Sequence, residues 1–238
     1  IETFSVMKDA SATAMYGARG ANGVILVTTK KGEEGSVYAS VRYEAIASMP
    51  TETIDVVDPV TYMRMYNQAL LARNPSATPA YSEERIARTG SKKYPSYAYP
   101  ANAWYKILFK NYNINHHFGL NIRGGSRVMQ YYASVNYNLD HGMMKTDKLN
   151  DFDVNIKNAT TTLRANLNID LAAGIRLLVN VYAALDDNHG PMIDSKGAYS
   201  LAFTASPVDF APTYPADDNY NWEHIRFGTT ASKKKNPY

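Results

Sequence analysis

Five segments of the chain alternate between apolar and polar residues, and this alternation limits the folds that the chain can adopt. Successive side chains of a β-strand point to opposite faces, so a period of two predicts a strand with one apolar and one polar face. Each segment is roughly ten residues long, whereas a globular strand usually has about 5–6 residues. We therefore expect a mainly β protein with five long strands, at 37–47, 112–123, 129–139, 163–171 and 175–186.

The two faces of these predicted strands differ in charge. The apolar face is unbroken by charged residues, while the opposite face carries Arg, Asp, Asn and Glu. Two architectures produce this pattern: a soluble antiparallel sheet with one wet face, and a membrane β-barrel with lipid outside and a polar lumen inside. In the barrel, the residues expected to face the lumen are Arg42, Glu44, Asn121, Arg123, Asn136 and Asn166.

The connections between the strands favour the barrel. Short turns at 124–126 and 172–174 alternate with long polar connections at about 48–110 and 141–160, and 188–238 reads as a further long loop. Outer-membrane barrels have short periplasmic turns and long extracellular loops, whereas a soluble meander has no reason to alternate in this way. Because a membrane barrel needs about eight strands, we expect the chain to be part of a longer polypeptide.

Composition narrows the function classes. The chain has no cysteine, so neither disulfides nor thiolate metal ligands are expected. Its net charge of +3 comes from scattered basic residues, which argues against a nucleic-acid partner. The sequence has no run of about 18 apolar residues, so no transmembrane helix is predicted. The 19 tyrosines against 2 tryptophans suit surfaces that are apolar at one end and wet at the other, such as carbohydrate sites and membrane interfaces.

One helix is predicted inside the first long connection. Asp58 can cap it, Pro59 suits its first position, and apolar residues then recur at helical spacing. A loop with a short helical turn is expected at 74–90, and an aromatic run follows at 94–105.

Two groups of residues are candidates for ligand contact. Tyr97, Tyr99 and Trp104 belong to the aromatic run and could stack on sugar rings, although an interfacial aromatic girdle or packing within the loop would use the same residues. Asp187, Asn188 and His189 form a polar cluster at a strand end, where they could contact substrate or simply begin a solvated loop.

The sequence contains no motif for catalysis or for metal binding. His116 and His117 are adjacent in a strand, so their rings point to opposite faces and cannot chelate one ion together. No nucleophile–base–orienter arrangement is discernible. We therefore expect no enzyme activity, no cofactor and no metal.

Three evenly spaced glycines, Gly17, Gly20 and Gly23, precede an apolar β-branched run at 24–29. A dinucleotide fingerprint needs G-x-G-x-x-G after a strand, and a P-loop needs G-K-[ST] before a helix. Here the spacing is G-x-x-G-x-x-G before a strand, and no G-K-[ST] follows. The structural prediction is a helix over 5–17 that Gly17 ends in a left-handed cap, then a turn and a buried strand.

The run "IETFSVMKDASATAMYGARGANGVILVTTKKG" at 1–32 resembles the closing segment of the plug domain in SusC/RagA-type TonB-dependent outer-membrane transporters. The resemblance continues through "TIDVVDPVTYMRMYNQA", a helix after the first strand, and through 103–147 and 160–183, the following hairpins. It departs from the family at "ATTTLRANLN", which keeps Arg164 and Asn166 but lacks the arginine–tyrosine pair that usually begins the fourth strand.

The resemblance implies a transmembrane antiparallel β-barrel, of about 22 strands in the whole protein, with an N-terminal α/β plug. The plug would end at 1–32 and the barrel would begin at 33–238. The plug motif would be structural and would include Gly17, Arg19, Gly20, Asn22 and Gly23.

In function, the resemblance implies import of a bulky glycan or peptide across the outer membrane of a Gram-negative bacterium. TonB would supply the energy through a segment outside this chain, and a SusD-like surface lipoprotein would act as a lid. Two alternatives stay open: a soluble β-rich carbohydrate-binding or adhesion module, and an outer-membrane receptor that signals rather than imports.

Overall fold

The computed structural model of the chain describes residues 2–8, 14–20, 22–148, 153–172, 174–216, 219, 224–230 and 235–238. The chain divides into two compact units. The sheet unit comprises Ile1–Ala45, His116–Leu139 and Ala159–Asp187, and the loop unit comprises Ile46–Asn115, Asp140–Asn158 and Asn188–Tyr238.

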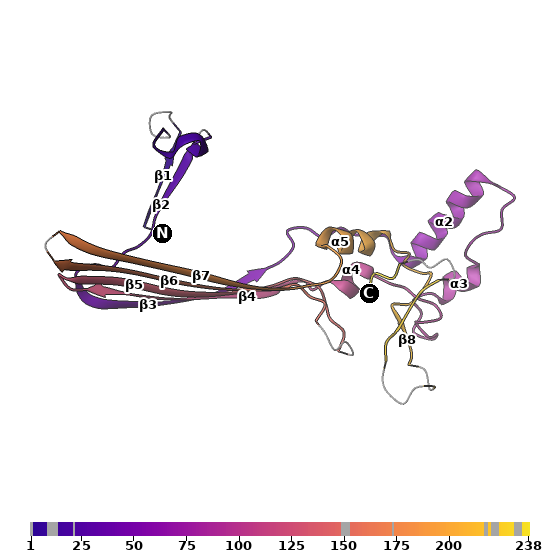
Figure 1. Cartoon of the computed structure of the whole chain (residues 1–238). Helices are drawn as coiled ribbons and strands as arrows, with labels where there is room; N and C mark the ends of the chain where they lie inside the picture. The colour runs from indigo at the N-terminus through magenta and orange to yellow at the C-terminus, as the bar shows by residue number, and fades with distance from the viewer. Residues whose placement is uncertain are drawn as a thin grey trace. The chain divides into compact units, whose positions relative to one another are not determined.

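A five-stranded sheet dominates the fold (Figure 1). Its strands lie in sequence order, so each strand pairs with the next one along the chain. This arrangement confirms the five predicted strands. The strands are β3 (Gly35–Ser48), β4 (Asn113–Gly125), β5 (Met129–His141), β6 (Lys157–Ala172) and β7 (Ile175–His189). The connection between β4 and β5 is short, but the turn lies at 126–128 and not at 124–126, because Gly124 and Gly125 belong to β4. The turn predicted at 172–174 includes residue 173, which lies outside the described residues.

The register between β4 and β5 places apolar residues opposite apolar residues and polar residues opposite polar residues. β4 and β5 are antiparallel, with Phe118 opposite Tyr137 on the apolar face and Asn121 opposite Ser134 on the polar face. Cross-strand pairs of this kind are the unit of sheet stabilisation, and a slip of one residue would move every side chain to the other face.

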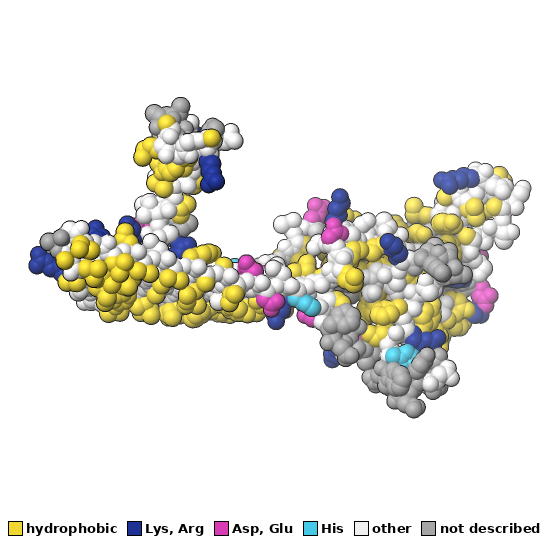
Figure 2. Space-filling view, viewed as in Figure 1, with side chains coloured by type: hydrophobic (Ala, Val, Ile, Leu, Met, Phe, Trp, Pro, Cys, Tyr) yellow, Lys and Arg dark blue, Asp and Glu magenta, His cyan; other side chains and the backbone are white. Residues whose placement is uncertain are grey.

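The apolar face of the sheet is exposed. Val41 is 68% exposed and Leu185 is 72% exposed, and Figure 2 shows hydrophobic side chains gathered along one side of the sheet. Soluble monomers rarely expose apolar patches larger than a few hundred Å². This face therefore requires an apolar cover, which is either lipid or another protein surface.

An antiparallel hairpin precedes the sheet. β1 (Thr3–Met7) pairs with β2 (Val24–Thr28), and the 3₁₀ helix η1 (Ala14–Gly20) lies between them. The helix predicted over 5–17 is therefore wrong, because its first residues are in β1, where Ser5 pairs with Leu26. β-Branched and aromatic residues such as those of β1 favour a strand once a partner strand is available.

The conformation of β2 and Gly17 also differs from the prediction. Gly17 has φ 60° and ψ −152° inside η1, so it does not end a helix in the left-handed cap geometry, which needs a positive ψ. The apolar run does form a strand, but Ile25 is 68% exposed. Among the described residues β2 pairs with β1 alone, and most residues of both strands are exposed.

The described part of the loop unit contains four helices. α2 (Pro59–Arg73) begins as predicted, because Asp58 accepts hydrogen bonds from the backbone N–H groups of Val60 and Thr61, each at 3.0 Å. α3 (Glu83–Arg88) is the predicted helical turn. α4 (Trp104–Leu108) and α5 (Ser195–Thr204) lie in regions that read as loops from the sequence.

Two small apolar cores hold the loop unit together. One contains Met63, Tyr81, Ile86 and Val208, and the other contains Trp104, Leu108, Ala202 and Phe210. Both cores join residues near the helices to the segment that follows α5. These contacts explain why the loop unit is compact. Across the described part of the chain, no helix has the length and apolar character needed to cross a membrane.

Candidate functional site

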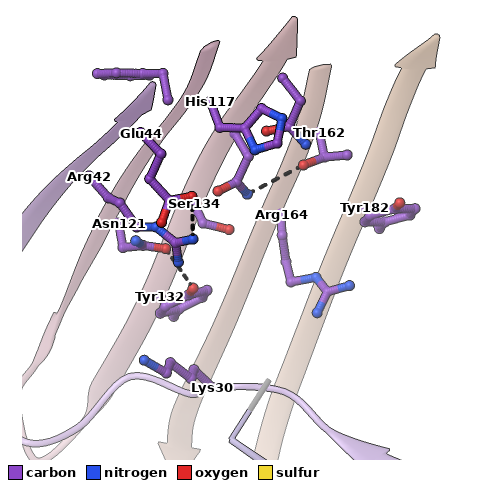
Figure 3. A pocket seen from close by; sticks show the side chains of 14 residues that line it. Lys30, Arg42, Glu44, His117, Asn121, Tyr132, Ser134, Thr162, Arg164 and Tyr182 are labelled. Atoms are coloured by element: carbon purple, nitrogen blue, oxygen red, sulfur yellow. Dashed lines mark hydrogen bonds and ion pairs between the residues drawn. The ribbon is translucent and has the colours of Figure 1, made fainter. Parts of the chain in front are cut away.

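The polar face of the sheet unit forms a hollow of about 650 Å³ (Figure 3). All five strands contribute side chains to it, and Lys30 comes from the segment between β2 and β3. The lining residues are Lys30, Arg42, Glu44, His117, Phe118, Gly119, Asn121, Tyr132, Ser134, Asn136, Asn138, Thr162, Arg164 and Tyr182.

The strand alternation explains this concentration of polar groups. The β4–β5 register places His117 opposite Asn138, and Gly119 opposite Asn136. Gly119 leaves room at the floor of the hollow, since a Cβ there would lie 3.0 Å from Oδ1 of Asn136. The absence of a side chain at 119 therefore lets the asparagine lie flat against β4.

Hydrogen bonds across neighbouring strands fix these side chains. Tyr132 donates its hydroxyl to Oδ1 of Asn121 at 2.9 Å, and Asn121 reaches Oγ of Ser40 at 3.5 Å. Asn136 donates to the hydroxyl of Thr162 at 3.3 Å. Amide and hydroxyl groups of this kind can donate and accept at the same time, so the surface suits water, sugar hydroxyls or peptide groups.

The hollow carries an excess of positive charge. Lys30, Arg42 and Arg164 are cationic, and Glu44 is the single carboxylate among the lining residues that the structure describes. Glu44 accepts from Nη2 of Arg42 at 2.7 Å in an exposed ion pair, which contributes little to stability. The guanidinium of Arg164 lies 5.2 Å from the centre of the Tyr182 ring, a cation–π distance.

Four of the six residues predicted to face a lumen line this hollow, and the other two contact the segment between β2 and β3. Arg42, Glu44, Asn121 and Asn136 line it directly. Arg123 pairs with Glu33 at 3.1 Å, and Asn166 donates to the backbone carbonyl of Lys30 at 2.8 Å.

The six lumen candidates do not include several contributors to the hollow. The alternation already puts His117 and Arg164 on the polar face, and counting every second residue would have added Tyr132 and Tyr182. Lys30 gave no such signal, because it lies outside the strands.

The plug-motif residues lie in η1 and just before β2. Gly17, Arg19 and Gly20 belong to η1, and Asn22 and Gly23 lead into β2. Gly23 has φ 97° and its missing Cβ would lie 3.2 Å from the carbonyl oxygen of Met7, so both backbone conformation and space favour glycine there.

The three aromatic candidates are in different surroundings. Tyr97 is 44% exposed with its ring centre 6.4 Å from that of Tyr214. Tyr99 accepts a hydrogen bond from Nη1 of Arg88 at 2.8 Å. Trp104 is only 3% exposed and donates its indole N–H to the carbonyl of Ser206 at 2.9 Å. The structure therefore makes Trp104 a core residue and corrects the idea of an exposed stacking platform at this position.

The polar cluster at 187–189 lies at the end of β7 and is exposed. These residues are thus part of a strand and not the beginning of a loop. His189 places Nε2 3.0 Å from the carbonyl oxygen of Asp153. The pKa of Asp153 is lowered because its carboxylate accepts hydrogen bonds from the hydroxyl of Thr146 and from the backbone N–H of Asn155. Within the described residues, no three His, Asp or Glu side chains gather closely enough to hold a metal ion.

A second cavity, of about 570 Å³, lies within the loop unit. Its walls include the segment Thr53–Pro59 as well as Trp104, Tyr105 and Phe203 from the two helices α4 and α5. The aromatic walls make it more apolar than the hollow on the sheet.

No protein-family model matches the chain. It is 29% identical to TonB-dependent receptor P26 of Formosa agariphila over 225 residues, which cover 93% of the chain and 20% of that receptor. It is also 29% identical to TonB-dependent receptor SusC of Bacteroides thetaiotaomicron, over 96% of the chain and 20% of SusC. The chain thus spans about a fifth of the length of the curated relatives that it matches.

The fold is similar to part of the solved structure of the RagAB peptide transporter. The TM-score is 0.66 at 21% identity, and the match covers 94% of this chain and 27% of the transporter chain. These comparisons confirm the resemblance to SusC/RagA-type TonB-dependent transporters and the mainly β, barrel-type fold class inferred from the sequence.

Proposed function

We propose that this chain forms part of a TonB-dependent importer in the outer membrane of a Gram-negative bacterium. In this proposal, β3–β7 are a section of the barrel wall, 33–238 is the beginning of the barrel, and 1–32 is the end of the plug. The observation that carries the proposal is the exposed apolar face that lies opposite a polar hollow on the same five strands.

The size of the apolar face fits a bilayer. On β7 the apolar residues run from Ile175 to Leu185, which corresponds to about 34 Å along an antiparallel strand. A tilt of about 40° reduces this length to about 26 Å along the membrane normal, close to the apolar band of about 25 Å in outer-membrane barrels. A soluble sandwich would bury this face under a second large sheet, whereas the other strands of the described chain form only two-stranded sheets.

The polar face is suited to binding and passage. Its amides, hydroxyls and cations can hold a hydrated ligand or a plug surface by hydrogen bonds. The whole protein would import a bulky glycan or peptide, with energy from TonB and with a SusD-like lipoprotein as its surface partner. Support for TonB-dependent import comes from the relative named TonB-dependent receptor SusC, and the structural neighbour named RagAB peptide transporter favours a peptide as cargo. The glycan alternative and the lipoprotein partner rest on the resemblance of the sequence.

Ligand contacts outside the hollow would come from groups at the surface. Tyr97 offers an exposed aromatic ring and Tyr99 a half-buried one, and Asp187, Asn188 and His189 offer exposed polar groups at the end of β7. The apolar cavity of the loop unit is large enough for a side chain or a small ligand group, since ligand pockets usually measure about 300–1,000 Å³.

Fractionation and uptake test the proposal. The full-length protein should sediment with outer membranes and require detergent for release, because its apolar face is covered by lipid. Recovery in the soluble fraction without detergent would overturn the membrane assignment and favour a soluble binding module.

A strain without the gene separates import from signalling. It should lose uptake of one glycan or peptide from a labelled panel, and the gene on a plasmid should restore it. A strain that keeps uptake of the whole panel but loses ligand-dependent gene expression would contradict import and favour a signalling receptor.

A further inference from the structure

The segment 29–33, which joins β2 to β3, contacts three strands of the sheet unit. The first contact is with β6. Asn166 donates its side-chain N–H to the carbonyl oxygen of Lys30 at 2.8 Å and lies 3.5 Å from the hydroxyl of Thr29. Asn166 is 7% exposed, so this hydrogen bond is shielded from competing water. A donor directed at a backbone carbonyl holds the main chain itself, whichever side chains it carries.

The second contact is with β4. Nη1 of Arg123 lies 3.1 Å from Oε1 of Glu33, and the Arg123 guanidinium lies 5.2 Å from the ring centre of Tyr38. The side chains of this ion pair are 36% and 69% exposed. Because water and salt screen such a pair, it contributes little to stability and mainly orients the segment.

The third contact is with β5 and depends on Gly32. Gly32 is buried, and a Cβ on it would lie 2.2 Å from the backbone nitrogen of Tyr131. Backbone atoms cannot move aside as the end of a flexible side chain can. The segment therefore lies directly on β5, at a distance that only glycine allows.

We propose that Asn166 is a positioning residue for transport, which, with Arg123 and Gly32, fastens the segment 29–33 to the inner wall of the barrel. The end of the plug is then fixed to the wall, and rearrangement of the plug is confined to the residues before Thr29. This inference rests on the proposed function for its role in transport, but the fastening itself can be measured independently.

Hydrogen exchange of the purified full-length protein in detergent tests the fastening. Replacing Asn166→Ala should speed exchange of the peptide that covers 29–33 by about tenfold, while peptides from β5 keep their rates. Asn166→Asp should have the same effect, because it keeps the shape of the side chain but has no N–H to donate at neutral pH. Asn168→Ala, on the same strand and the same face, is the matched control and should leave the segment unchanged.

The role in transport is tested by uptake in cells that carry these variants. Both Asn166 variants should reduce the uptake rate severalfold while surface binding of the same ligand is kept, and Asn168→Ala should behave as the unmodified protein. Unchanged exchange in both Asn166 variants would overturn the fastening. Faster exchange with unchanged uptake would overturn the role in transport.

Two further controls keep these outcomes distinct. If the Asn166 variants do not assemble, Glu33→Gln removes the exposed ion pair, and a smaller increase in exchange of the same peptide is expected; no increase would contradict the three-point attachment. If deletion of the gene affects no uptake, the proposed function fails, whereas the exchange experiment still decides whether the segment is fastened.

Discussion

An arginine on the apolar face should be far more harmful than the same arginine on the polar face. Val181 and Asn180 are neighbours in β7 and point to opposite faces. We predict that Val181→Arg strongly destabilises the folded protein in a membrane, whereas Asn180→Arg does not. Strand, depth and introduced side chain are the same in both variants, so only the face differs.

The expected cost follows from the position of Val181 in the apolar band. The band runs from Ile175 to Leu185, so Val181 is one residue from its middle. Arginine at the bilayer midplane costs about 2–4 kcal/mol, falling to about 0–1 kcal/mol near the interfaces. Since about 1.4 kcal/mol is a factor of ten, Val181→Arg should lower the ratio of folded to unfolded protein about 30- to 700-fold, and Leu185→Arg should lower it only a few-fold.

The assay is the refolding of full-length variants into lipid vesicles across a urea series, followed by the shift of the folded band in unheated gel samples. The urea midpoint should fall strongly for Val181→Arg and little for Leu185→Arg or Asn180→Arg. Equal midpoints for Val181→Arg and Asn180→Arg would refute the two-faced sheet. Equal, large losses at Val181 and Leu185 would refute a depth-dependent lipid environment and would point to a packed protein core.

Three further predictions concern the loop unit. Asn67 donates to the Tyr81 carbonyl at 2.6 Å and accepts from the Tyr81 N–H at 3.0 Å. Asn67→Ala should therefore destabilise the loop unit by about 1–3 kcal/mol for each backbone group of Tyr81 that is left unpaired. Thermal unfolding measures this loss, and an unchanged melting temperature would contradict it. Trp104→Ala should cost about 3–5 kcal/mol as a large core truncation, whereas Tyr97→Ala, at an exposed ring, should cost about 0.5 kcal/mol or less and reduce ligand binding; similar melting temperatures would disprove the distinction. The lowered pKa of Asp153 should add stability that is present above the usual pKa of about 3.9 and is lost as the pH falls through the lowered pKa. Asp153→Asn should therefore flatten the acid limb of a curve of stability against pH. An unaltered acid limb would argue against this contribution.

The sheet could be predicted from the sequence because its signal is local. Each strand alternates over its own length, so the five strands and the two faces follow without knowledge of their partners. The N-cap Asp58 and Pro59 likewise mark the start of α2 within a few residues. In the hairpin the local signal was misleading. The run after Phe4 could form a helix, but it forms β1 because β2, about twenty residues further on, supplies a partner.

The rest of the site could not be predicted, because it depends on contacts between distant residues. The hydrogen bond from Asn166 to Lys30 spans 136 residues of sequence, and no sequence periodicity predicts it. Trp104 looked like part of an exposed aromatic run, but residues after α5 bury it, through Phe210 and the carbonyl of Ser206. Local pattern therefore decides which face a side chain takes, while distant segments decide what that face contacts.

The two faces of β6 should consequently carry separable functions. Ala165 and Leu167 point to the apolar face, and Asn166 between them holds the segment before β3. In the proposed barrel wall, lipid would cover the outward face, so changes to the outward residues should impair assembly in the membrane. A change at Asn166 should leave assembly intact and alter the mobility of the linked segment. If substitutions at all three positions impaired assembly equally, both faces of the sheet would be packed against protein, and the soluble sandwich would account for the chain better than the barrel wall.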